Sequence, residues 1–396
     1  MIQISPETQL FIREHSSDDV RALALQAKKY PDIDMPTAIT QIAGRKVAAE
    51  KIPSWWEIEK IWYPKHLSLE QCSSEITARY KARLLQGDSL TDLTGGFGID
   101  CSFLATGFKS ATYVERQEEL CEIAAHNFPV LNLNHINIKN EDGVTYLQAM
   151  SPVDCLFLDP ARRNEHGGKT VAISDCEPNV AELEELLLQK ANRVMIKLSP
   201  MLDLSLALKE LKQTQEVHIL SVNNECKELL ILLGQTSPAE IAIHCVNLLT
   251  KGTQEEQHFV FTREQEQRSQ CTYTDSLGDY LYEPNASLLK AGAFRSIATA
   301  YPVRKLHPNS HLYTSDSFIE NFPGRIFRIV NQCSFNKKEV KENLADLKKA
   351  NVTVRNFPAT VAELRKRLHL TEGGDTYLFA STLNNGQKVI IRCEKV

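Results

Sequence analysis

The residues with the clearest chemical potential surround a glycine-rich turn. Asp92 closes an apolar run, and Thr94, Gly96 and Gly98 follow it before a helix-like segment begins. Seventeen residues after Gly98, a second acid, Glu115, closes another apolar run. A strand, a glycine-rich turn, a helix, a second strand and an acid able to bind ribose hydroxyls form a nucleoside-binding layout. The spacing predicts a nucleoside cofactor, with a chance glycine turn as the alternative.

The turn lacks two features of a dinucleotide site. Pyrophosphate binding uses Gly-x-Gly-x-x-Gly, and Cys101 stands where the third glycine is expected. Asp100 would lie in the first helical turn, where its charge would repel a phosphate. S-adenosylmethionine carries no phosphate and needs only close backbone approach and a nearby carboxylate. The turn therefore favours S-adenosylmethionine over a dinucleotide.

A second group of candidate residues follows the apolar run 153–158. Asp159 and Pro160 put a carboxylate and a carbonyl acceptor at the end of this strand, and proline stops the strand. Such acceptors can orient an amine with its lone pair toward an electrophilic methyl group. Arg162 and Arg163 in the same loop could bind phosphate or a substrate carboxylate. The alternative is a helix start, with Asp159 as the cap.

These residues need elements that bring them to one edge of a sheet. Apolar runs alternate with helical stretches between 88 and 233, which predicts an open α/β sheet with ligands at the carboxyl ends of its strands. No helix fits in 223–227, so we expect the last two strands to form a hairpin and the sheet to end antiparallel. The predicted strands are 88–93, 111–114, 135–138, 153–158, 193–198, 217–222 and 228–233.

The remaining segments flank this sheet. The segment 1–86 is predicted to be helical, and Trp55, Trp56 and Trp62 indicate a small hydrophobic core within it. After the sheet we expect two small α+β domains, the first containing strands near 241–246 and 258–261. The last is predicted to run β(325–332), α(337–349), β(352–356), α(360–367), β(376–382) and β(387–393). The predicted domains are therefore 1–86, 87–233, 234–322 and 323–396.

Composition is that of an ordinary globular protein. The 396 residues are 42% hydrophobic and 24% charged. No apolar run approaches the roughly 20 residues that span a bilayer, and the first residues lack a signal-peptide pattern. The ten cysteines include no Cys-x-x-Cys pair, which suits buried reduced thiols. We therefore expect a cytoplasmic protein with no membrane contact and no metal site.

Charge is distributed unevenly along the chain. The net charge is −5, yet residues 323–396 hold 14 Lys and Arg against 7 Asp and Glu, a net charge of +7. A basic segment attached to an acidic body indicates a polyanionic partner. A solvated domain with lysine-rich helices is the alternative.

Taken together, these motifs resemble the successive motifs of class I S-adenosylmethionine-dependent methyltransferases, over about 88–233. The chain also has a basic tail, and upstream of it the segment Val194–Pro200, which contains Lys197. In these two features it is similar to a bacterial group of these enzymes that carry a THUMP-like C-terminal domain. THUMP domains are RNA-binding modules of modification enzymes. The resemblance implies a Rossmann-like methyltransferase sheet. The motifs that carry it are Asp92-Leu93-Thr94-Gly95-Gly96-Phe97-Gly98, Glu115, Asp142 and Asp159-Pro160-Ala161-Arg162.

The resemblance also implies roles for the matching residues at the cofactor. Glu115 would accept hydrogen bonds from the ribose hydroxyls, and Asp142 from the adenine amine. In similar enzymes a helix such as 70–81 lies over the cofactor pocket, although it could simply pack against the sheet. The residues implied at the methionine and ribose end are Asp92, Thr94, Gly96 and Gly98.

At the substrate, Asp159 and the Pro160 carbonyl would hold the nucleophile. The family's second proline and following aromatic residue are replaced by Ala161 and Arg162, so a flipped base would have to stack elsewhere. Lys197 stands at the end of the strand 193–198, where it could contact substrate or cap the strand. No cysteine follows that strand, which argues against a covalent mechanism at pyrimidine carbon-5.

We therefore expect an enzyme that transfers a methyl group from S-adenosylmethionine directly to a base nitrogen of RNA, either tRNA or rRNA. One alternative is a methyltransferase that acts on a protein or a small molecule. Another is a non-catalytic RNA-binding protein that keeps the methyltransferase fold as a scaffold.

Overall fold

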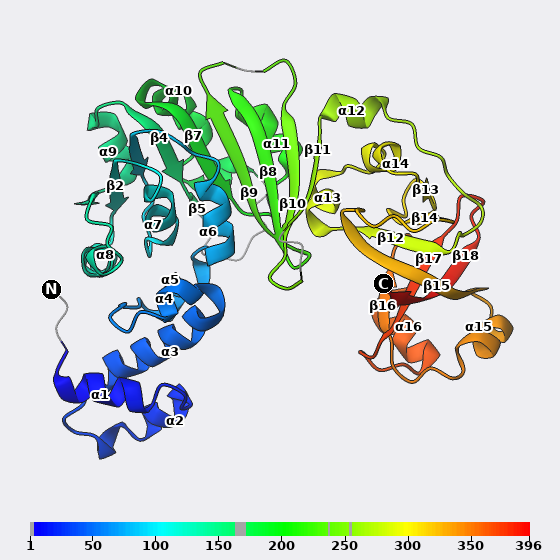
Figure 1. The fold of residues 1–396 in the computed structure, drawn as a ribbon, viewed down its shortest axis with the longest axis horizontal. Coiled ribbons are helices and arrows are strands. Elements are labelled where there is room, and N and C mark those ends of the chain that lie inside the picture. Colours follow the sequence, from blue (N-terminus) through cyan, green and yellow to red (C-terminus); the bar gives the residue numbers. More distant parts are fainter. Residues whose placement is uncertain (1–3, 163–171, 237, 253–255) are drawn as a thin grey trace. The chain divides into compact units, whose positions relative to one another are not determined.

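The computed structural model describes residues 4–162, 172–236, 238–252 and 256–396 (Figure 1). Of the residues singled out above, Arg163 lies outside this set. The chain forms two compact units, each interrupted in sequence. The first contains Met1–Gln215 and Leu230–Pro238, and the second contains Glu216–Leu229 and Ala239–Val396.

The first unit begins with short helices, drawn in blue in Figure 1. Their starts follow from the sequence, because Ser5, Asp19 and Asp34 each cap a helix by accepting hydrogen bonds from its first N–H groups. Among the described residues, no helix is long and apolar enough to cross a membrane. The helices are α1 (Pro6–Glu14), α2 (Val20–Leu25), η1 (Ala27–Lys29), α3 (Met35–Lys51), α4 (Pro53–Trp56), α5 (His66–Gln71) and α6 (Glu75–Ala82).

A nine-stranded sheet follows, in the order β11-β10-β8-β9-β7-β4-β1-β2-β3. The pairs β1–β2, β1–β4, β2–β3 and β4–β7 are all parallel, as expected for strands joined through helices. Its strands are β1 (Ser89–Asp92), β2 (Ser110–Glu115), β3 (Ile136–Asn140), β4 (Val153–Leu158), β7 (Ala191–Leu198), β8 (Thr214–Val222), β9 (Glu225–Gly234), β10 (Ala242–Leu248) and β11 (Glu256–Phe261). The connecting helices are α7 (Ile99–Ala105), α8 (Glu118–Val130), α9 (Gly143–Ala149), α10 (Val180–Lys190) and α11 (Leu204–Glu210).

The predicted hairpin and the predicted fold class are confirmed. Only Asn223 and Asn224 separate β8 from β9, and both adopt positive φ, 49° and 69°, as tight hairpin turns require. β9 therefore runs antiparallel to β8, and it lies between β7 and β8 in the strand order. The strands expected near 241–246 and 258–261 exist as β10 and β11, but they extend this same sheet.

The second unit also holds a seven-stranded sheet, in the order β13-β14-β12-β15-β18-β17-β16. Its last part follows the predicted β-α-β-α-β-β order. Its strands are β12 (Tyr280–Pro284), β13 (Arg304–Lys305), β14 (Tyr313–Ser315), β15 (Gly324–Ser334), β16 (Asn351–Val354), β17 (Thr376–Thr382) and β18 (Lys388–Lys395). The helices of this unit are α12 (Arg263–Arg268), α13 (Ala286–Ala291), α14 (Ser296–Ala300), α15 (Lys337–Leu344) and α16 (Val361–Leu368).

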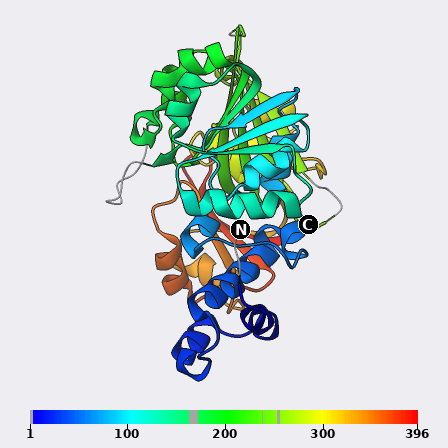
Figure 2. The same ribbon diagram turned by 90° about the vertical axis from the view of Figure 1, so that its left-hand side faces the viewer.

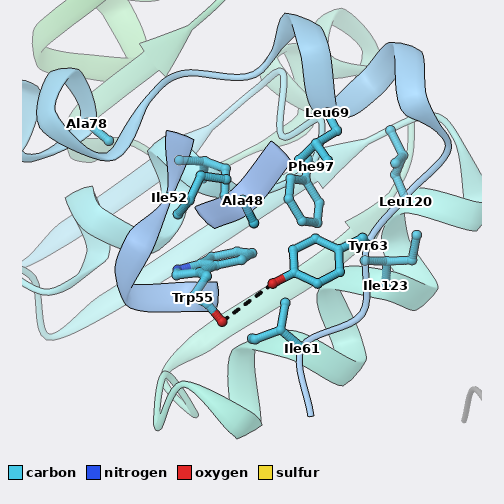
Figure 3. Close-up of a cluster of buried hydrophobic side chains, with 11 residues drawn as sticks. Ala48, Ile52, Trp55, Ile61, Tyr63, Leu69, Ala78, Phe97, Leu120 and Ile123 are labelled. Carbon is cyan, nitrogen blue, oxygen red and sulfur yellow. Dashed lines mark hydrogen bonds between the residues drawn. The ribbon is translucent and has the colours of Figure 1, made fainter. Parts of the chain in front are cut away.

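One hydrophobic core joins the N-terminal helices to the glycine turn (Figure 3). Phe97 of the turn packs against Trp55, with the ring centroids 5.2 Å apart, and against Tyr63. Tyr63 Oη donates to the Trp55 carbonyl. Trp55 therefore belongs to a core, as expected for this tryptophan cluster, whereas Trp56 is 44% exposed. Residues of α8 complete the core, and Figure 2 shows this helix between the strands and the N-terminal helices.

Gly95 offers a direct test of how tightly the turn is packed. A Cβ at Gly95 would lie 2.2 Å from the ring of Tyr113, which is fully buried and cannot move aside. We expect Gly95→Ala to destabilise the protein by about 1–3 kcal/mol, the usual cost of overpacking. Thermal unfolding measures the change. Gly107→Ala is the matched control, because its nearest atom would be 3.7 Å away. Equal melting temperatures for both variants would contradict the packing described here.

Candidate active site

The glycine turn connects β1 to α7 and presents its backbone at the carboxyl edge of the sheet. Gly98 N donates to Gly95 O at 2.9 Å, and Gly96 and Gly98 adopt positive φ of 54° and 86°. Tyr113 of β2 supports the turn, because its hydroxyl donates a hydrogen bond to Gly96 O at 2.5 Å. A Cβ at Gly96 would meet only Thr94 O, at 3.8 Å. The backbone at Gly96 is therefore open to close approach by a ligand.

Asp92 ends β1 with an unsatisfied acceptor. Its side chain is buried, and Oδ1 accepts from Thr94 N at 3.0 Å. Oδ2 has no hydrogen-bond partner among the described residues. Burial raises the pKa of Asp92 well above its usual range, and the nearby acids Asp100, Asp159 and Glu115 raise it further. Because an unsatisfied buried acceptor is costly, this oxygen is a natural position for a donor on a bound ligand.

The two acids expected at the ribose and adenine lie beyond neighbouring strands. Glu115 ends β2, and its two oxygens accept from Gly96 N at 2.9 Å and Gln117 N at 2.8 Å. Asp142 follows β3 and caps α9, accepting from Val144 N and Thr145 N, both at 3.0 Å. β2 and β3 are parallel, so both acids lie at the same edge of the sheet as Asp92.

Asp159 and Pro160 lie directly beside the glycine turn. β4 is the parallel neighbour of β1, and Asp159 N donates to Thr94 Oγ1 at 2.6 Å. Pro160 is buried, whereas the side chain of Asp159 is 38% exposed. The two strongest sequence motifs therefore meet at one place, and the Asp159 carboxylate is accessible from solvent.

Two lysines balance the acids at this edge. Lys197 Nζ lies 2.5 Å from Asp159 Oδ2 and 3.5 Å from Asp100 Oδ2, so it bridges both carboxylates. Lys81 of α6 lies 2.9 Å from Asp100 Oδ1, and its side chain is fully buried. Ser73 Oγ donates to Asp100 Oδ2 at 2.7 Å and accepts from Lys81 Nζ at 2.8 Å. We refer to Lys81, Asp100, Lys197 and Asp159 as the acid–lysine network.

The pKa values of the two acids in this network shift in opposite directions. Burial raises the pKa of Asp100, but the Lys81 and Lys197 ammonium groups outweigh burial and lower it overall. Burial also raises the pKa of Asp159, and there Lys197 offsets only part of the effect. Asp100 therefore acts as a fixed charge, while Asp159 is the acid better able to take up a proton.

The residues after Pro160 form a short ribbon. β5 (Ala161–Arg162) pairs antiparallel with β6 (Cys176–Glu177), which follows the 3₁₀ turn η2 (Ile173–Asp175). The backbone of Arg162 thus continues from the Asp159 loop. Arg163 lies outside the described residues.

Sequence reasoning missed the role of Lys81 and the position of Cys72. Lys81 lies one helical turn after the buried Thr77 and Ala78. A lysine on the buried face of a helix was therefore the sequence feature that could have indicated its role. Cys72 interacts electrostatically with Asp100, Lys197 and Lys81. Burial raises the pKa of Cys72 to about 11, so its thiol stays protonated near pH 7.

Two domain families match the C-terminal part of the chain. Residues 280–323 match a ferredoxin-like domain family, and residues 324–395 match a THUMP domain-like family. The crystal structure of a "putative methyltransferase" from Porphyromonas gingivalis W83 is 34% identical, covers 100% of both chains and has a TM-score of 0.88. No curated protein matched the chain.

Two further solved structures match part of the chain. An rRNA methylase from Streptococcus thermophilus is 15% identical and covers 40% of this chain and 93% of its own, with a TM-score of 0.30. A "putative methyltransferase" from Streptococcus mutans in complex with SAH is 12% identical and covers 40% and 96%, also with a TM-score of 0.30.

The strand order, shared with the Porphyromonas gingivalis structure at a TM-score of 0.88, is that of a class I methyltransferase fold. The chain belongs to the family of methyltransferase-fold proteins with a THUMP-like C-terminal domain that includes the Porphyromonas gingivalis protein.

The buried cation of the acid–lysine network can be tested by removing it. Lys81→Met would leave Asp100 buried with one ammonium group fewer, and breaking such a pair costs about 3–5 kcal/mol. We expect a large fall in melting temperature at pH 7. Lys109→Met is the control, because Lys109 forms an equivalent pair with Asp88, at 2.8 Å, on the surface. An equal effect of the two changes would contradict the account.

The pH dependence of this effect follows from the direction of the Asp100 shift. In the wild type the pKa of Asp100 lies below its ordinary 3.8, so its ionised form stabilises the fold above that pH, and the contribution is lost as pH falls through the lowered value. Without Lys81, burial pushes this pKa upward. The deficit of Lys81→Met, measured by thermal unfolding, should therefore shrink as the pH falls from 7 toward the ordinary 3.8, because a protonated Asp100 needs less compensation.

Proposed function

We propose that this protein is an S-adenosylmethionine-dependent methyltransferase that methylates a base nitrogen of RNA by direct transfer. The observation that carries the proposal is the junction of the two motifs. Asp159 and Pro160 sit at the end of β4, joined through Thr94 to the glycine turn after β1. This junction puts acceptors for a nucleophile next to an open backbone for a cofactor.

The residues at the edge fit S-adenosylmethionine, which would supply an electrophilic methyl group. Asp92 has a buried oxygen without a partner among the described residues, and it would accept from the ammonium group of the methionine part. Thr94, Gly96 and Gly98 would line the same end. Glu115 would accept from the ribose hydroxyls and the exposed Asp142 from the adenine amine.

Asp159 is suited to orienting an amine and accepting its proton. Its partly exposed carboxylate and the Pro160 carbonyl would accept hydrogen bonds from the amine, directing the lone pair toward the methyl group. A raised pKa makes Asp159 the better proton acceptor once the nitrogen becomes positively charged. Lys197 Nζ donates a hydrogen bond to this carboxylate. A substrate amine would replace Lys197 as the donor, and Lys197 would thereby guide substrate entry.

The cysteines support direct transfer over a covalent intermediate. Cys72 lies close to the acid–lysine network and Cys155 lies within β4, and burial raises the pKa of each to about 11. A thiolate nucleophile requires the opposite shift.

RNA as the substrate is supported by the THUMP-like domain. α15 and α16 pack their apolar residues against one face of the sheet, with Leu344 and Leu368 among them. Their basic side chains therefore face solvent, which favours contact with phosphates. The exposed ones are Lys337, Lys338, Lys341, Lys366 and Arg367. Arg162 and Arg163, on the loop after Asp159, are proposed to bind the phosphate nearest the target base.

The division proposed for this function is a helical segment 1–86, a methyltransferase domain 87–233, a connecting segment 234–322 and a basic domain 323–396. The helical segment would hold the glycine turn rigid through Phe97, and the basic domain would present the RNA.

Asp159→Asn tests the catalytic assignment. The change preserves shape but removes the charge that holds the amine and accepts its proton. We expect S-adenosylhomocysteine to bind as tightly as to the wild type in isothermal titration, while methyl transfer falls about 100-fold or more. Asp88→Asn is the control, since Asp88 is an exposed acid at the opposite end of β1. Full transfer by Asp159→Asn would refute its role, and no cofactor binding by the wild type would refute the enzyme.

Charge reversal on α15 tests the RNA assignment. Lys337→Glu, Lys338→Glu and Lys341→Glu together should weaken RNA binding by the full chain. The slope of log affinity against log salt should fall by about 2, since each lost contact contributes about 0.7 for single strands. Lys28→Glu with Lys29→Glu is the control on the exposed η1 turn. An unchanged salt dependence would favour a protein or small-molecule substrate.

A further inference from the structure

A row of imidazole rings crosses three strands of the second unit. Glu216 and His218 lie two residues apart on β8, so they share one face of the sheet. His244 on the parallel strand β10 is the register partner of His218. His258 on β11 is opposite Val246, two residues beyond His244. Four potential metal ligands therefore lie side by side on one sheet face.

The ligand atoms of three of these residues converge. Glu216 Oε2 lies 3.6 Å from His218 Nε2 and 3.6 Å from His244 Nε2. All three ligand atoms lie within 4.8 Å of one another. Zn–N distances of about 2.0–2.1 Å in a tetrahedron place neighbouring ligand atoms about 3.4 Å apart. The cluster is thus within a few tenths of an ångström of tetrahedral spacing on two of its three edges.

The fourth residue is positioned to orient a ligand. His258 Nε2 lies 3.2 Å from His244 Nδ1, and their rings stack with centroids 5.3 Å apart. A metal-binding histidine usually engages its second nitrogen in this way, which fixes the tautomer and the ring orientation.

The cluster is also accessible on one side. His218 is buried, but the Glu216 and His244 side chains are 24% and 20% exposed and His258 is exposed. An ion could enter from solvent, and a water molecule could take the remaining coordination position.

We propose that Glu216, His218 and His244 bind a divalent transition-metal ion, best fitted by Zn²⁺, and that His258 orients His244. Two imidazoles and one carboxylate suit Zn²⁺, whereas Mg²⁺ and Ca²⁺ prefer oxygen ligands. Bound there, the ion would fasten β10 to β8 and so stabilise this part of the sheet. No metal site was expected from the cysteine spacing, and these ligands could not be found in the same way because they are spread over separate strands.

The test titrates metal-free, full-length protein with Zn²⁺ in a calorimeter and with Co²⁺ in a spectrophotometer. We expect one ion per chain, the visible absorption of tetrahedral Co²⁺, and a higher melting temperature with Zn²⁺. A thiolate-to-cobalt charge-transfer band would instead place the ion on cysteine and overturn the proposal, as would the absence of binding.

Variants assign the site. His244→Gln should abolish the cobalt spectrum, and His258→Gln should weaken metal affinity about 10–100-fold, as loss of an orienting partner does. Both side chains are partly exposed, so these variants are expected to fold, whereas the buried His218 is a less suitable position. His126→Gln is the control, because His126 is a half-buried histidine of α8 whose Nε2 lies 2.8 Å from the Lys60 carbonyl oxygen and which has no part in the cluster. Affinity that is unchanged in His244→Gln would overturn the proposal.

Discussion

The structure depends on how negative charge is neutralised at the carboxyl edge of the main sheet. Parallel strands end together, so the acids that close or follow them converge, and Asp92, Asp100 and Asp159 lie near one another in a largely buried space. Lys81 and Lys197 make this arrangement tolerable by balancing Asp100 and Asp159. Among the described residues Asp92 Oδ2 has no hydrogen-bond partner, and burial raises the pKa of this carboxyl group. Lysines therefore balance Asp100 and Asp159, whereas the buried oxygen of Asp92 is the proposed acceptor for the ammonium group of the cofactor.

The same edge is held rigid by apolar packing. Phe97 inserts into the core formed by the N-terminal helices, Gly95 lies against Tyr113, and Tyr113 bonds to the turn through its hydroxyl. Helix α6 also delivers Lys81 to Asp100, so this helix does more than pack. A site fixed from both sides loses little entropy when it binds, which is the advantage of preorganisation.

Much of this architecture could be predicted from sequence, because the signals are local. Strand and helix periods predicted the elements, and a gap too short for a helix predicted the β8–β9 hairpin. The glycine turn and Asp159-Pro160 predicted where a site would lie. The partners of those residues could not be predicted, since Lys81 and Cys72 reach Asp100 only through tertiary packing. The cluster of Glu216, His218, His244 and His258 could not be predicted either, because strand register brings these residues together.

RNA methylation at the Asp159 site can be tested by comparing methylated nucleosides by mass spectrometry. tRNA and rRNA are isolated from cells with the gene, without it, and with the gene restored as wild type or as Asp159→Asn. We expect that one base-methylated nucleoside is lost when the gene is deleted, returns with the wild type and stays absent with Asp159→Asn. Identical nucleoside profiles in all four strains would contradict RNA methylation at the Asp159 site.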